Sequence, residues 1–93
     1  MRRAAKTDAN HAIIVTFLRQ CHCSVLDLSG VGGGCPDLLV AARGHNILVE
    51  IKDGSKRPSE RKLNTLQKVW HNQWKGPVVV VESVDDALRL VRG

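Results

Sequence analysis

Apolar residues recur at helical spacing in three parts of the chain. The first part begins near Asp8 and ends near Cys21, the third follows Ser83, and the second carries the stripe Leu63, Leu66, Trp70 and Trp74. An apolar residue on every turn gives a helix one face to bury, so each part predicts an amphipathic helix. Gly76-Pro77 ends the second helix, and Ser83 is a favoured N-cap for the third.

Shorter apolar runs have the length and composition of β-strands: residues 24–28, 37–42, 46–52 and 78–81. The second and third runs are separated only by Arg43, Gly44 and His45, so we expect them to pair as an antiparallel hairpin. The last run consists of valine alone, which is typical of a strand covered on both faces.

The order helix, three strands, helix, strand, helix predicts an α/β fold. Three strands form an antiparallel meander, and a crossover helix brings the fourth strand parallel to its neighbour. A chain of 93 residues has room for one core, so residues 1–93 are expected to form a single domain. The expected architecture is a mixed four-stranded sheet flanked by helices.

The charge balance favours a polyanionic partner. Lysine and arginine outnumber aspartate and glutamate by 14 to 9, a net charge of +5. Residues 1–6 carry Arg2, Arg3 and Lys6 without apolar periodicity. They are interpreted either as a basic arm that contacts phosphates or as a frayed terminus.

Three features exclude other kinds of site or setting. The chain has an odd number of cysteines (Cys21, Cys23 and Cys35) and no stretch that resembles a secretory signal, so a reduced, cytoplasmic protein is expected. The spacing of the cysteines is not that of a zinc site, and they are interpreted as buried or idle thiols. No apolar run is long enough to cross a bilayer. Residues 30–34 are glycine-rich but lack the Lys-Ser/Thr of a nucleotide-binding loop, so no nucleotide cofactor is expected.

Two charges interrupt the run at residues 46–52, which otherwise reads as a central strand. Glu50 and Lys52 are two positions apart and therefore share one face. If the hairpin turns about Gly44-His45, Asp37 faces Lys52 and lies diagonal to Glu50. Two carboxylates and an ammonium at one place predict either a hard divalent-cation site or a structural salt bridge.

The strings Gly34-Cys35-Pro36-Asp37 and Val49-Glu50-Ile51-Lys52 resemble the VRR-Nuc branch of the PD-(D/E)XK nuclease superfamily. The similarity continues through Gln67, Trp70-His71, Gly76-Pro77 and Val81-Glu82-Ser83, and covers residues 8–91. It implies a restriction-endonuclease-like fold and a DNA-hydrolysing enzyme that depends on Mg²⁺, with Mn²⁺ as a substitute.

The resemblance also implies roles for individual residues. Asp37, Glu50 and the backbone carbonyl of Ile51 would bind the cation, and Lys52 would orient or deprotonate the attacking water. Gln67 would contact a metal-bound water or phosphate, or else be a surface glutamine. His71, one turn further on, is interpreted either in the same way or as an exposed histidine.

The first helix departs from the VRR-Nuc pattern, in which an acidic residue there commonly completes the site. Asp8 is either that carboxylate or the helix N-cap, a position for which Thr7 and Asn10 are also available. A flexible basic loop follows the catalytic strand. Its cations, expected to contact the DNA backbone, are Lys56, Arg57, Arg61 and Lys62.

Stand-alone members of the VRR-Nuc branch resemble Holliday-junction resolvases, so the expected function is an endonuclease acting as a homodimer on branched DNA such as four-way junctions. The interface is expected at Trp74, the surface of the first helix and the loop around Cys35. The alternatives are a catalytically silent nucleic-acid-binding module, a flap or end-processing nuclease, and a structural subunit of a larger complex.

Overall fold

The computed structural model describes residues 7–93, and the basic arm predicted at residues 1–6 lies outside this range. The elements are α1 (His11–Gln20), β1 (Ser24–Asp27), β2 (Leu38–Ala42), β3 (His45–Ile51), a 3-10 turn (Pro58–Glu60), α2 (Thr65–Gln73), β4 (Val78–Val81) and α3 (Val84–Arg92). The predicted order of helices and strands is confirmed, and the 3-10 turn lies in a segment predicted as loop. Within the described range, no helix has the length and apolarity needed to span a membrane.

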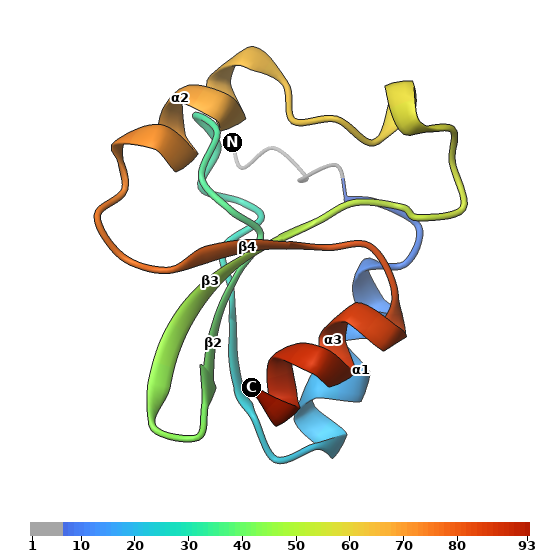
Figure 1. Ribbon diagram of the computed structural model, residues 1–93, viewed down its shortest axis with the longest axis vertical. Coiled ribbons are helices and arrows are strands. Elements are labelled where there is room, and N and C mark those ends of the chain that lie inside the picture. The colour runs from blue at the N-terminus through green and yellow to red at the C-terminus, as the bar shows by residue number, and fades with distance from the viewer. Residues whose placement is uncertain (1–6) are drawn as a thin grey trace.

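The strands form one four-stranded sheet in the order β1-β2-β3-β4 (Figure 1). β1, β2 and β3 are an antiparallel meander, and β4 is parallel to β3. The segment between β3 and β4 contains α2, because a parallel pair needs a long crossover connection. The predicted mixed α/β fold is therefore confirmed.

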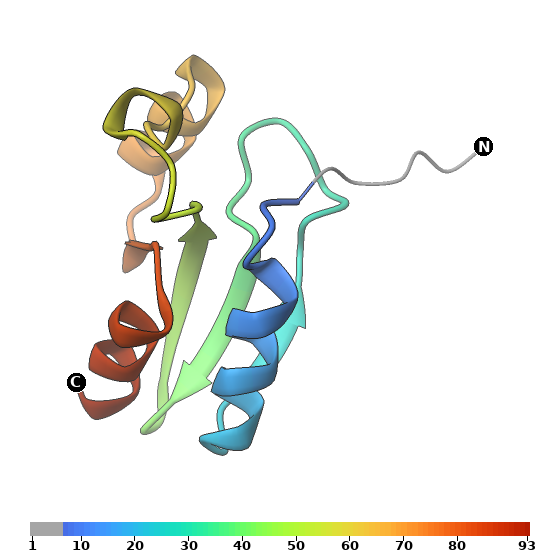
Figure 2. The same cartoon turned by 90° about the vertical axis from the view of Figure 1, so that its right-hand side faces the viewer.

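One face of the sheet carries the core, beneath α1 and α3, which lie side by side on it (Figure 2). The largest fully buried side chains of this core are Ile14, Leu18, Leu38, Val40, Val49 and Ile51. Successive residues of a strand point to opposite faces. Because Leu38 and Ile51 face the core, Asp37, Glu50 and Lys52 belong to the other face.

The β2–β3 hairpin turns at Arg43-Gly44, one residue earlier than predicted. Arg43 and Gly44 have φ angles of 52° and 77°, the left-handed conformation of a two-residue hairpin turn whose twist matches its strands. His45 consequently belongs to β3. The register places Asp37, just before β2, level with Glu50, so the predicted position opposite Lys52 is wrong.

Two elements predicted to be covered are exposed. β4 is an edge strand on which Val79 and Val80 are 38% and 41% exposed, so the prediction of cover on both faces is wrong. No residue of α2 is buried, and Trp70 and Trp74 stack on each other with ring centroids 4.9 Å apart instead of entering the core. The reason is that α2 lies beyond the end of the sheet rather than across it (Figures 1 and 2).

Candidate active site

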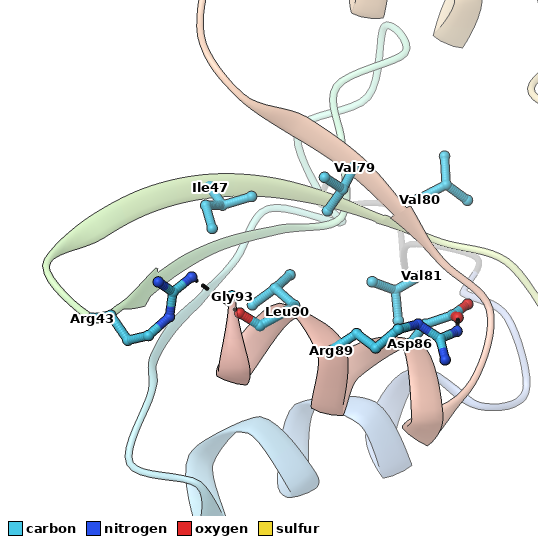
Figure 3. A pocket seen from close by; sticks show the side chains of 9 residues that line it. All are labelled: Arg43, Ile47, Val79, Val80, Val81, Asp86, Arg89, Leu90 and Gly93. Atoms are coloured by element: carbon cyan, nitrogen blue, oxygen red, sulfur yellow. Dashed lines mark hydrogen bonds and ion pairs between the residues drawn. The ribbon is translucent and has the colours of Figure 1, made fainter.

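Two hollows of the surface differ in their chemistry. A hollow of about 390 Å³ between β4 and α3 is lined by apolar side chains with Arg43, Asp86 and Arg89 (Figure 3). Its acid, Asp86, already bonds Arg89 and the Glu82 backbone N–H. The other, of about 420 Å³, is mostly polar and is lined by Asp8, Asp37, Glu50, Lys52, Lys56 and Gln67. It gathers the predicted catalytic residues, so it is the candidate active site.

Asp37 is held at the start of β2 by its neighbours. The Pro36 side chain before it is fully buried. Asp37 Oδ2 accepts a hydrogen bond of 2.8 Å from the backbone N–H of Ile51. The N–H and C=O of one strand residue leave the same edge of the strand, so the Ile51 carbonyl emerges beside Asp37 as well. The structure therefore brings two of the predicted oxygen ligands together.

Glu50 is a buried acid, with only 2% of its surface exposed. Burial, followed by the charge of Asp37 and a side-chain hydrogen bond with it, raises the pKa of Glu50 from 4.5 to about 8; Lys52 opposes this shift and Asp8 adds to it. Its Oε1 has no hydrogen-bond partner among the described residues. Two neighbouring acids, one of them buried, favour a shared proton or a bound cation.

Gln67 connects the helix α2 to the charged strand. Its Nε2 donates to Glu50 Oε2 at 3.3 Å, and its Oε1 accepts from Lys52 Nζ at 2.9 Å. Lys52 Nζ is itself 3.9 Å from Glu50 Oε2. The interpretation of Gln67 as a surface residue is wrong, and the predicted set of Asp37, Glu50, Lys52 and Gln67 converges in one place.

Asn64 is a residue of the site that sequence reasoning missed. It caps α2: its side chain accepts from the Gln67 N–H, and its own N–H donates to Gln67 Oε1, both at 2.9 Å. This capping box fixes the Gln67 side chain at the first turn of the helix. The available signal was the spacing Asn-x-x-Gln before an amphipathic stripe.

The glycine-rich loop, residues 30–34, lies close to α2 and sets its position. Gly34 has a φ of +89°, and a Cβ added to it would lie 2.5 Å from the backbone oxygen of Leu66. Only a residue without a side chain allows the loop before Asp37 to approach α2 this closely.

Replacing Gly34 by alanine should therefore destabilise the protein more than replacing Gly33. Gly33 also has a positive φ, +67°, but a Cβ there would meet nothing within 4 Å. Gly33→Ala should lower the free energy of unfolding by about 1–2 kcal/mol, because alanine is strained at a left-handed φ. Gly34→Ala should lower it further, because the clash with Leu66 adds to this strain. Urea denaturation measures both changes; equal losses would contradict the proposed role of Gly34.

His71 lies beside Glu50, outside the hollow that Glu50 shares with Asp37. The His71 side chain is 12% exposed, and its Nε2 is 3.9 Å from Glu50 Oε1. Burial, with a smaller effect of Lys52, lowers the pKa of His71. The interpretation of His71 as an exposed histidine is wrong.

Asp8 lies on the wall of the site rather than at the cap of α1. Asn10 occupies the N-cap position, and no side chain caps the helix. Asn10 instead donates to the backbone oxygens of Lys52 and Glu82, at 3.1 and 3.2 Å. The N-cap prediction for Asp8 is therefore wrong, and its carboxylate lines the same hollow as Asp37 and Glu50.

The basic loop is partly neutralised within the chain. Arg57 pairs with Glu60 at 2.9 Å, and Arg61 donates to both carboxylate oxygens of Glu82. Lys56 and Lys62 are exposed and take part in none of the ion pairs formed among residues 7–93. They are the better candidates for contacts with phosphates.

The donors of this site fit a hard cation. In the described part of the chain, no three side chains of histidine, cysteine, aspartate or glutamate converge on one point, and the three cysteines are free. A cation would be held here by Asp37, Glu50 and the Ile51 carbonyl together with water. Mg²⁺ suits such a set, because it keeps several waters and binds one or two carboxylates.

Comparisons with protein-family models, with curated proteins and with solved structures give no match.

Proposed function

We propose that this protein is a Mg²⁺-dependent endonuclease that hydrolyses phosphodiester bonds of DNA. The observation that carries the proposal is the buried Glu50 carboxyl beside Asp37, with one oxygen lacking a hydrogen-bond partner among the described residues. A salt bridge alone leaves this arrangement unexplained, because Lys52 Nζ is 3.9 Å from Glu50 and bonds Gln67 instead. A divalent cation relieves the repulsion between the two acids and takes the place of the proton that Glu50 would otherwise hold.

The residues divide the chemistry among them. Bound Mg²⁺ would supply a Lewis acid that stabilises charge on the phosphate and lowers the pKa of water. Asp37, Glu50 and the Ile51 carbonyl would hold it. Lys52 places a positive charge where hydroxide develops, and Gln67 fixes the direction of that ammonium group. Lys52 directly follows β3, on the same face as Glu50, and lines the same hollow.

The test is hydrolysis of a supercoiled plasmid by the purified protein with Mg²⁺, with Mn²⁺ and with a chelator. We expect nicking that requires the cation and stops in the chelator. DNA binding without nicking would instead support the catalytically silent binding module, and absence of both would support the structural subunit.

Lys56 and Lys62 should contribute to DNA affinity through the phosphate backbone. Each phosphate contact adds about 0.9 to the slope of log affinity against log salt, so neutralising both with Lys56→Gln and Lys62→Gln should lower the slope by about 2. The matched control removes two exposed charges from the far ends of α1 and α3, with Arg19→Gln and Arg92→Gln. An equal slope in the two double variants would mean that these lysines are exposed to solvent and do not contact the DNA.

We further propose a homodimer that acts on branched DNA. In support, large apolar side chains of the predicted interface are exposed: Ile13 on α1, Val31 in the loop before Cys35, and Trp74 after α2. A two-fold axis would present two sites to the symmetric strands of a four-way junction. Solution mass, and cleavage rates on equal concentrations of junction, flap and duplex, test this. A monomer that cuts duplex as fast as junction contradicts it.

A further inference from the structure

Two buried polar atoms face each other behind the proposed cation site without being bonded. They are Glu50 Oε1 and His71 Nε2, 3.9 Å apart, and among the described residues neither has a hydrogen-bond partner. A buried polar atom without a partner destabilises the fold, so a facing pair of them needs an explanation. The hollow that Asp37 and Glu50 share is not lined by His71, so the histidine lies behind Glu50 rather than among the ligands.

The helix α2, which carries His71, is held to the rest of the described residues by few contacts. No residue of this helix is buried in the core. Leu66 approaches Gly34 in the loop before β2, and Gln67 and His71 approach Glu50 on β3. A helix held by a few polar contacts can move by the distance of about 1 Å that separates 3.9 Å from a hydrogen bond.

We propose that His71 is a positioning residue for the metal site: its Nε2–H donates to Glu50 Oε1 when Glu50 binds the cation as a carboxylate. Ligating carboxylates are commonly held by an outer hydrogen bond of this kind. Gln67 already donates to the other oxygen, Oε2, so the two side chains of α2 would fix the Glu50 carboxylate from both of its oxygens. The inference rests on the proposed function, because it assumes that a cation binds at Glu50.

The test compares two amides at position 71 that differ in reach. In His71→Gln the amide nitrogen can occupy the place of Nε2, whereas in His71→Asn the side chain is one carbon too short. Mg²⁺ is titrated into the wild type and both variants without DNA. The readout is tryptophan fluorescence, because the two tryptophans, Trp70 and Trp74, lie in α2 and at its C-terminal end. Free Mn²⁺ counted by electron paramagnetic resonance gives the affinity independently.

We expect His71→Asn to weaken cation binding by about 10- to 100-fold and His71→Gln to restore most of this loss. Asn72→Gln, an exposed neighbour on the same helix, serves as the control and should match the wild type. Equal affinities in the two His71 variants would overturn the inference while leaving the nuclease proposal intact. A wild-type protein that binds neither cation would overturn the proposed function instead.

Discussion

Glu50→Gln and Asp37→Asn should each lower the rate of DNA hydrolysis by about three orders of magnitude while the fold is kept. Both changes are nearly isosteric, and each removes a negatively charged ligand from a site where bound cation would contribute several kcal/mol to the transition state. The loss should appear in single-turnover nicking assays at saturating Mg²⁺. The circular dichroism spectrum should remain that of the wild type.

The controls are Glu60→Gln and Asp85→Asn, which make the same chemical changes at exposed positions outside the site. They should retain wild-type rates to within a small factor. Normal activity in either site variant would show that the assignment of the active site is wrong.

Without metal, the stability of the wild type should fall as the pH rises through the range in which Glu50 is protonated only in the folded state. Its pKa is raised from 4.5 to about 8 by burial and by Asp37. Below the lower value both states carry the proton, and the stability is fully present. Above it the unfolded chain loses the proton first, so the free energy of unfolding decreases until the pH passes the folded pKa.

Between pH 5 and pH 8 this effect should amount to roughly 4 kcal/mol, and Glu50→Gln should remove it. Urea denaturation of the two proteins in chelator at both pH values measures the difference. Parallel pH dependences would contradict the raised pKa. Saturating Mg²⁺ should flatten the wild-type curve, because the cation then takes the place of the proton on Glu50.

The exposed faces of α2 and β4 were not predicted from the hydrophobic pattern. The stripe at Leu66, Trp70 and Trp74 and the valines of β4 predicted elements covered by the rest of the chain, but these residues are partly exposed. A hydrophobic stripe specifies that one face of an element avoids water, and it does not specify what covers that face. Among residues 7–93, α1 and α3 occupy one side of the sheet, and α2 reaches the other side only at its end, beside Glu50.

Local periodicity and connection length were enough to predict the order of the elements, the mixed sheet, and the shared face of Glu50 and Lys52. Three features could not be predicted without the packing of the elements against one another. Asp37 is level with Glu50, Gln67 bonds Lys52, and His71 lies beside Glu50. The position of Asp37 depends on where the hairpin turns, because a shift of the turn by one residue changes every pairing along the ladder. The others join residues of separate elements, and their distances arise only when α2 docks at the end of the sheet.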